Sequence, residues 1–489
     1  MVQGNEILVL KVKLKMLKSD LKGWNKDVFG HTDKIKLDIV KKIQELDMRD
    51  DEDGLDENRI MERKDLLNQL QVINTRNESL LQQKSRALWI KQGDSNSKFF
   101  HASIKWRRMR NGIKGVLCQN SGSWVEEPNT VKEMVKEFYK NKMIVVDDIG
   151  VRLDNVEFKK LFDHDNNFLT EPFDGKEIKE AIWNCDSHKS PGPDGITFSF
   201  IKNNWGLLEK DVEGVVNCFY REGKIPKGCN ASFLTLIPKI ENPQSLEEYR
   251  PISLVSCVYK FLTKLLANRI KKVIGKVVDG TQSAFLSNRG LLDSVLVVNE
   301  VIDELKRRKK SGVVVKLDFE KAYDSVSWEF LFYIMRILGF CEKWIQWIRA
   351  CLESASVSVL VNGSPTKEFK PSRGLRQGDP MTPFLFLIVA QGLAGLVNEA
   401  IRKNLLSGIK VGGKKVDVNL LQFDDNTLFV CESKVQNIIC IKAILRCFEL
   451  SSGLRVNYHK SKIGAIGGNP SRCSFWKHVL LKVRKKLSV

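Results

Sequence analysis

The stretch Val313-Val314-Val315-Lys316-Leu317-Asp318-Phe319 decides the fold that we expect for this chain. Its β-branched run is typical of a buried strand, and residues 320–331 after it are compatible with a helix. A carboxylate at the end of a strand is held rigidly, which suits a metal ligand. The sequence therefore predicts a strand that ends in a candidate metal-binding residue, Asp318.

A second acidic segment lies far downstream. Residues 416–423 and 427–430 read as two strands that flank Asp424-Asp425-Asn426, which predicts an acidic hairpin turn. If these strands neighbour the first one in a sheet, Asp318 meets the turn. Nucleotidyl transfer with two divalent cations needs carboxylates that converge in this way. Acidic turns are common on protein surfaces, so the spacing by itself favours a purely structural role.

Composition limits the classes of partner. The chain has 489 residues, and 79 Lys and Arg against 59 Asp and Glu leave a net charge of +20. This length allows two or three domains, and the charge favours a polyanion, either nucleic acid or an anionic membrane surface. Its 11 cysteines form no C-x-x-C pair, so we expect reduced thiols and no zinc site. No apolar run reaches the roughly 18 residues of a membrane span.

We therefore expect a soluble protein of the nucleus or the cytoplasm, without a membrane partner. The basic run at residues 306–310 fits a nuclear localisation signal, and it fits equally well the solvated end of a helix before the strand. The oligomeric state stays open at this point.

The N-terminal part differs in amino-acid composition from the rest of the chain. Residues 11–81 are rich in Lys, Leu, Asp and Glu and contain no proline, which predicts long polar helices. Aromatic and basic residues then alternate, a pattern that suits base stacking and phosphate binding but also an aromatic core edge with a solvated basic turn. The composition changes between residues 147 and 168, so we expect a basic helical region over residues 1–150. Its candidate nucleic-acid contacts are Lys84, Arg86, Lys98, Arg107 and Arg108.

Residues 316–324, 374–380 and 421–428 stand out together. In this order they resemble motifs A, B and C of reverse transcriptases, and the resemblance is closest to plant LINE-type non-LTR retrotransposons. Residues 191–195, 236–239, 249–254 and 282–289 look like the fingers of that family, and residues 452–461 look like its motif D. Residues 80–110 look like its linker before the polymerase, so the resemblance covers nearly the whole chain.

The resemblance implies an α+β fold, a right-hand polymerase with an antiparallel palm sheet. Fingers and palm would occupy residues 165–465, after the helical region, and residues 466–489 would be a fragment of a largely missing thumb. The implied activity is RNA-directed DNA polymerisation, with an RNA template, a DNA primer and dNTPs as partners and two Mg²⁺ ions as cofactor.

The resemblance also assigns roles residue by residue. The catalytic residues would be Asp318, Asp425, Asn426 and Lys460, of which Asp318 and Asp425 would bind metal and Lys460 would protonate the leaving pyrophosphate. Substrate contacts would come from Lys239 and Arg250 on the triphosphate, Phe319 through its carbonyl, Tyr323 under the sugar, where it selects against a 2′ hydroxyl, and Gln377 and Gly378 near the incoming nucleotide.

One position departs from the family pattern. The family has Phe-Ala-Asp-Asp-Thr at motif C, and this chain has Phe423-Asp424-Asp425-Asn426-Thr427. The ungapped alignment puts Asn426 at the second aspartate, whereas a shifted alignment would turn the pair to opposite sides of the strand. Loss of one negative charge opposite two dications predicts impaired catalysis.

The family's N-terminal endonuclease and most of its thumb have no counterpart in the sequence, which suggests a truncated, degenerate element copy. Two functional hypotheses remain: a reverse transcriptase of reduced activity, or a catalytically inactive retroelement relic that binds nucleic acid.

Overall fold

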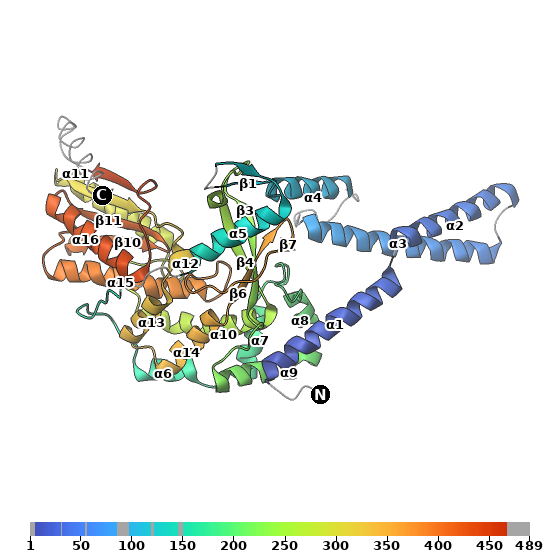
Figure 1. The fold of residues 1–489 in the computed structure, drawn as a ribbon, viewed down its shortest axis with the longest axis horizontal. Helices are drawn as coiled ribbons and strands as arrows, with labels where there is room; N and C mark the ends of the chain where they lie inside the picture. Colours follow the sequence, from blue (N-terminus) through green and yellow to red (C-terminus); the bar gives the residue numbers. More distant parts are fainter. Residues whose placement is uncertain are drawn as a thin grey trace. The chain divides into compact units, whose positions relative to one another are not determined.

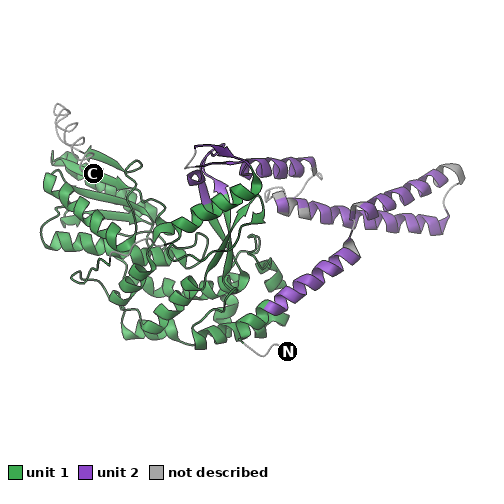
Figure 2. Cartoon of the chain, viewed as in Figure 1, with its two compact units in different colours: residues 1–11, 127–236, 251–489 green, residues 12–126, 237–250 purple. Residues whose placement is uncertain are grey.

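The computed structural model describes residues 5–30, 32–53, 56–85, 97–118, 122–144 and 150–466. The chain divides into two compact units (Figure 2). Unit 1 comprises residues 1–11, 127–236 and 251–489, and unit 2 comprises residues 12–126 and 237–250. The domain boundary expected between residues 147 and 168 therefore falls inside unit 1. The expected thumb fragment at residues 466–489 lies, except for Ile466, outside the described residues.

Unit 2 is built mainly from helices, so the predicted helical N-terminal region is confirmed. The helix α1 (Glu6–Phe29) starts in unit 1 and continues into unit 2. The helices α2 (Thr32–Asp53) and α3 (Glu57–Ser85) pack on each other, and α4 (Ser97–Asn111) precedes a hairpin of β1 (Val116–Leu117) and β2 (Trp124–Val125). The α2–α3 core consists of Ile39, Ile43, Leu46, Leu66 and Ile73.

The main sheet of unit 1 has the strand order β10-β11-β5-β12, and every neighbouring pair is antiparallel (Figure 1). Its strands are β5 (Gly312–Leu317), β10 (Leu420–Phe423), β11 (Asn426–Glu432) and β12 (Lys462–Ile466). We call it the acid-bearing sheet, because Asp318 follows β5 and the Asp424-Asp425 turn joins β10 to β11. The predicted strand, the hairpin and their adjacency are confirmed.

The two faces of this sheet are different. Val313, Val315 and Leu317 of β5 are buried on one face, and Phe319, which continues their alternation, packs on Phe448 of α16 (Val435–Ser452) with ring centroids 6.1 Å apart. The alternate residues make the other face. There Val314, Leu428 and Ile466 pack around Val301 and Leu305 of α11 (Leu291–Arg307).

The predicted strand at residues 416–423 is in fact two strands. The first, β9 (Val416–Val418), pairs with β8 (Ile409–Val411) in a separate hairpin, and only β10 joins the acid-bearing sheet. The break falls at Asn419, whose carbonyl accepts a hydrogen bond from the Val430 amide at 2.8 Å. The two strands are separate because they pair with different partners. Alternation of apolar and polar residues in the sequence does not show which strand pairs with which.

The helix α15 (Thr382–Arg402) corrects an expectation about apolar runs. It is long and apolar enough to cross a membrane by length and composition, but 78% of its most apolar window is buried inside the protein. It packs against α13 (Trp328–Ile337) and α16. Its composition is therefore that of a mostly buried core helix.

A second sheet has the order β4-β3-β6-β7, with β3 parallel to β6. Its strands are β3 (Ala231–Pro238), β4 (Tyr249–Val255), β6 (Ser356–Val361) and β7 (Ser364–Pro365). The remaining helices are α5 (Pro128–Lys142), α6 (Asp163–Thr170), α7 (Gly175–Trp183), α8 (Phe198–Asn203), α9 (Trp205–Glu222), α10 (Cys257–Val273), α12 (Ala322–Ser325) and α14 (Glu342–Glu353), with short 3₁₀ turns at η1 (Leu246–Glu248) and η2 (Ile274–Lys276).

The basic run at residues 306–310 begins within the last turn of α11. Arg307 and Arg308 both form ion pairs with Glu304 one turn earlier. These contacts agree with the interpretation as a helix end.

The loop at residues 191–195 caps a helix. The Asp194 carboxylate accepts hydrogen bonds from the backbone amides of Cys257, the first residue of α10, at 2.6 Å and of Ile196 at 3.3 Å. A Cβ atom at Gly192 would lie 2.3 Å from the Val255 carbonyl oxygen, so only glycine fits there. The proline- and glycine-rich loop thus has a clear structural function at the start of α10.

We predict that Asp194→Ala lowers the free energy of unfolding by about 1–2 kcal/mol, because a helix N-terminus loses its side-chain acceptor. Chemical denaturation followed by circular dichroism measures the change. Asp194→Asn keeps an acceptor oxygen and should retain most of the stability; equal losses in both variants would contradict the capping role.

Candidate active site

Asp318 is held in place through its backbone. Its carbonyl accepts a hydrogen bond from the Asn457 amide at 2.8 Å, and its amide donates to Ser461 Oγ at 3.2 Å. The Ser461 hydroxyl in turn donates to the Asn457 carbonyl at 2.7 Å. The segment that looks like motif D therefore fixes the residue that looks like the motif A metal ligand.

The acidic hairpin reaches the same end of the sheet. Thr427 of β11 pairs with Leu317 of β5, so one step further along this register Asn426 lies opposite Asp318. Asp424 and Asp425 form the two-residue turn between Phe423 and Asn426, and Asp424 takes a positive φ of 58°. The register thus puts Asp318, Asp425 and Asn426 at the same end of the sheet.

Gln282 supports the hairpin from a segment distant in sequence. Its side-chain oxygen accepts hydrogen bonds from the amides of Asp424 at 3.1 Å and Ala284 at 3.0 Å, and its amide group donates to the Asp424 carbonyl at 3.4 Å. Gln282 is fully buried and forms a bridge with Gln422 of β10. Although residues 282–289 looked like fingers, this part of them lies beside the acid-bearing sheet.

Tyr323 contacts the turn directly. Its hydroxyl donates a hydrogen bond to the Asp424 carboxylate, and its ring packs on Phe386 of α15 with centroids 4.8 Å apart. Burial, together with the negative charge of Asp425, raises the pKa of Asp424 to about 6. Burial and the bond to Asp424 raise the pKa of Tyr323. The sequence singled out Tyr323 but gave no signal of this partner.

The segment that looks like motif B is hydrogen-bonded to Tyr323 and to the residue after it. The Leu375 amide donates to the Tyr323 carbonyl at 2.7 Å, and the Gln377 side chain donates to Asp324 at 3.4 Å. Gly378 has a φ of 104°, and a Cβ there would lie 3.1 Å from the Ser253 carbonyl oxygen. Glycine therefore allows the turn that places Gln377 beside Asp324.

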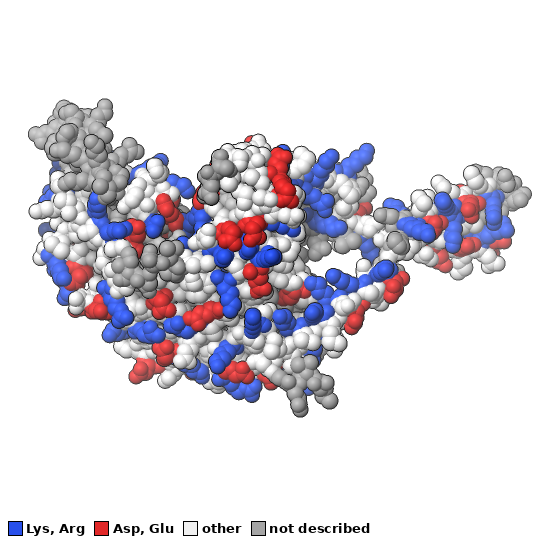
Figure 3. All heavy atoms as spheres, in the orientation of Figure 1, with Lys and Arg blue, Asp and Glu red and all other residues white. Residues whose placement is uncertain are grey.

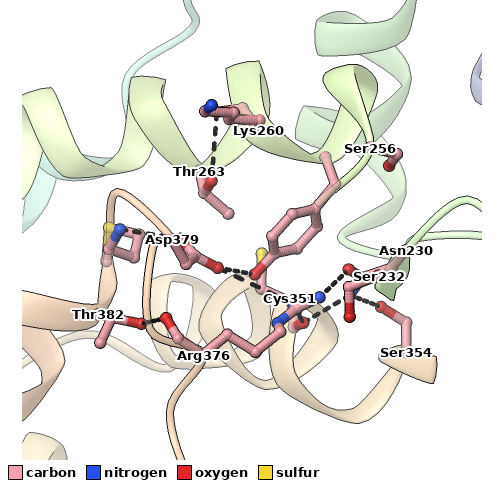
Figure 4. Close-up of polar contacts among 12 residues, drawn as sticks. Asn230, Ser232, Ser256, Lys260, Thr263, Cys351, Ser354, Arg376, Asp379 and Thr382 are labelled. Carbon is pink, nitrogen blue, oxygen red and sulfur yellow. Dashed lines mark hydrogen bonds and ion pairs between the residues drawn. The ribbon is translucent and has the colours of Figure 1, made fainter. Parts of the chain in front are cut away.

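A buried polar network holds the residues on both sides of this turn (Figure 4). The Arg376 guanidinium donates to Asn230 at 2.6 Å and to the Cys351 carbonyl at 3.1 Å, and it lies 4.1 Å from the Tyr259 ring centroid. The Tyr259 hydroxyl donates at 2.5 Å to Asp379, which accepts from the amide of Met381 just before α15. Burial raises the pKa of Tyr259, so its hydroxyl stays a donor. Local sequence gave no indication of these partners.

The other predicted site residues lie in different places. Phe319 is buried, Lys460 is exposed on a turn, and the Lys460 amide donates to Asn457 Oδ1 at 3.2 Å. Lys239 and Arg250 belong to unit 2, where Lys239 Nζ donates to the Glu247 carbonyl at 2.9 Å.

The predicted nucleic-acid contacts are Lys84 on α3 and Lys98, Arg107 and Arg108 on α4, whereas Arg86 lies outside the described residues. Figure 3 shows Lys and Arg gathered over α4 and along α1.

The acids at the sheet end are too few for a complete two-metal site. Within the described ranges, no three His, Cys, Asp or Glu side chains come together so that they could hold a metal ion. Asn426 supplies a neutral amide, and the Asp424 carboxylate is bonded to Tyr323. Asp318 and Asp425 are the two candidate metal ligands at this end, and the Asp425 carboxylate also accepts a hydrogen bond from the Asn426 side chain at 3.3 Å. Their hard oxygen atoms suit Mg²⁺. This donor set fits one divalent cation better than two.

A family model described as "Reverse transcriptase (RNA-dependent DNA polymerase)" matches residues 237–479. The chain contains a reverse transcriptase domain. The match encloses β5, β10, β11 and β12, and hence every strand of the acid-bearing sheet. Polymerases of this family use divalent metals, which agrees with the oxygen donors at the sheet end.

Related proteins come from mobile elements. The chain is 25% identical to the "Transposon TX1 uncharacterized 149 kDa protein" of Xenopus laevis over 92% of its own length and 34% of that protein. It is 27% identical to the "Retrovirus-related Pol polyprotein from type-2 retrotransposable element R2DM" of Drosophila melanogaster over 58% and 25% of the two chains. It is 26% identical to the "RNA-directed DNA polymerase from mobile element jockey" of Drosophila funebris over 45% and 24%.

These relatives support a reverse transcriptase domain of the non-LTR type, as the motif order predicted. The chain spans between about a quarter and a third of their lengths.

We predict that Asp424→Asn stabilises the reverse transcriptase domain more at pH 8 than at pH 5. Because the folded pKa of Asp424 is raised to about 6, the folded state binds its proton more tightly than the unfolded state. The free energy of unfolding therefore falls as pH rises from about 4 through 6. Asparagine removes this fall and keeps an acceptor for Tyr323. Thermal unfolding midpoints in a chelator-containing buffer measure the difference; the same difference at both pH values would contradict it.

Proposed function

We propose that the chain is an RNA-directed DNA polymerase of reduced activity, which extends a DNA primer on an RNA template with dNTPs. The observation that carries the proposal is the pairing of Thr427 with Leu317, which sets Asp318 and the acidic turn at one end of the sheet. Two acids fixed on neighbouring strands suit a reaction that needs negative charge at a rigid position. The plant LINE-type origin rests on the motifs alone.

Asp318 and Asp425 would hold Mg²⁺, with the Phe319 carbonyl and the neutral oxygen of Asn426 as weaker donors. The bound cation would activate the primer hydroxyl and neutralise the triphosphate. The hydrogen bonds from Asn457 to Asp318 and from Gln282 to Asp424 support this assignment, because they fix the backbone of Asp318 and of the turn that carries Asp425 before any cation binds.

The remaining residues would position the substrates. Tyr323 lies on Phe386 beside the acids and would pack under the nucleotide sugar, and Gln377 and Gly378 would border the incoming base. The exposed Lys460 would protonate the pyrophosphate. The assignment of Lys239 and Arg250 to the triphosphate rests on the motifs alone.

Basic side chains on the helical part would hold the template and primer. Lys98, Arg107 and Arg108 share α4 with Trp106, which is 55% exposed, and the Arg110 guanidinium lies 5.1 Å from the Trp106 ring centroid. An exposed aromatic ring beside guanidinium groups suits base stacking next to phosphate. Lys84, exposed on α3, would add a further phosphate contact, and Arg86 stays a candidate on the sequence alone. A nucleic-acid-binding protein without catalysis is the second candidate, favoured by the missing third acid.

We predict that Asn426→Asp raises the rate of primer extension about 10-fold or more, because it adds a full negative charge where a divalent cation would bind. The measurement is metal-dependent extension of a labelled DNA primer on an RNA template. Asp318→Ala serves as the control and should abolish all extension.

Equal, robust extension by the wild type and by Asn426→Asp would overturn the claim of impairment. Salt-dependent binding of the template–primer without any product, in both proteins, would overturn the polymerase proposal and leave the binding protein.

A further inference from the structure

A row of four side chains crosses the acid-bearing sheet directly behind its acidic end. In the register of the sheet, Leu421 of β10 pairs with Leu428 of β11, Leu428 with Lys316 of β5, and Lys316 with Lys462 of β12. Lys316 precedes Asp318 by two residues, so both lie on the same face of the sheet, roughly 6.4–6.8 Å apart along the strand. We call this set the Leu421–Lys462 row.

The two lysines of the row face each other with like charge. Both are exposed, and no ion pair joins either ammonium group to a carboxylate within the part of the chain that the structure describes. Like charges directly across an antiparallel pair destabilise a sheet. An anion bound between the ammonium groups would offset this repulsion.

The other half of the row is apolar. Leu421 and Leu428 are half-buried, and Leu428 continues the surface that Val314 and Ile466 form against α11. The row therefore presents hydrocarbon and positive charge side by side, next to Asp318. A sugar–phosphate backbone has the complementary chemistry, because its sugars present C–H groups and its phosphates are charged.

We propose that Lys316 and Lys462 bind a backbone phosphate of the nucleic-acid strand whose end lies at Asp318 and Asp425. The inference rests on the proposed function and adds a specific contact to it. The acids at the sheet end repel a phosphodiester, and two cationic groups on the adjacent row offset that repulsion where the strand approaches. A strand fits better than a free nucleotide, because only a strand extends past the acids over both halves of the row.

The test compares duplex binding by the full chain and by the double variant Lys316→Gln/Lys462→Gln. The probe is a fluorescent DNA primer, ended by a dideoxynucleotide and annealed to an RNA template, in Mg²⁺ buffer. Fluorescence anisotropy over a range of KCl concentrations gives the slope of log K against log salt. We expect the slope to decrease in magnitude by about 1, since the one phosphate that the two lysines bind contributes about 0.9.

The matched control is Lys410→Gln/Lys414→Gln, which removes the same charge from exposed lysines of the β8–β9 hairpin and should keep the wild-type slope. Lys316→Arg/Lys462→Arg should also keep it, which separates lost charge from lost folding. A second arm titrates dNTP into the protein–duplex complex. Weaker dNTP binding with an unchanged salt slope would assign the lysines to the triphosphate and overturn the proposal.

An unchanged salt slope together with unchanged dNTP binding, or an equal loss of slope in the Lys410→Gln/Lys414→Gln control, would also overturn it. The proposed function can fail separately. If the wild type extends no primer, but the double lysine variant still shows the smaller salt slope, the phosphate site stands and the polymerase proposal falls.

Discussion

The antiparallel pairing of β5 with β11 is the constraint on which the rest of the site depends. Burial of Val313, Val315 and Leu317 on one face fixes the register with Thr427 opposite Leu317. A slip by one residue would turn these side chains to the other face and bury Lys316 and Asp318, which alternate with them. The hydrophobic core therefore determines where the acidic side chains lie, although it contains none of them.

Hydrogen bonds from distant segments then hold the acids at the sheet end. Residues 457–461 fix the backbone of Asp318, and Gln282 fixes that of Asp424. The turn of the segment that looks like motif B is held by other contacts. The buried Arg376 donates to Asn230, the buried Asp379 accepts from Tyr259, and the two charged side chains form an ion pair with each other. Buried charges of this kind destabilise a fold when one partner is removed, and they specify one arrangement when all are present.

The distribution of negative charge explains the expected weakness of the chemistry. The chain places a carboxamide opposite Asp318 and an extra carboxylate one residue before Asp425. That extra carboxylate is partly desolvated and serves as an acceptor for Tyr323. Charge has therefore moved from a position where it would face a cation to one where it orients an aromatic ring, and the electrostatics of the site change although the count of acids does not.

The sequence by itself determined the strand before Asp318, the acidic hairpin, the helical N-terminal region and the order of motifs, because local patterns of burial and turn residues report these features. The tertiary structure alone decided which strands pair. It divided residues 416–423 at Asn419, brought Gln282 to the hairpin, gave Tyr323 its acidic partner and buried α15. The physical reason is that alternation shows that a side chain is buried but not what covers it, and contacts such as that between Gln282 and Asp424 join segments that carry no local signal of each other.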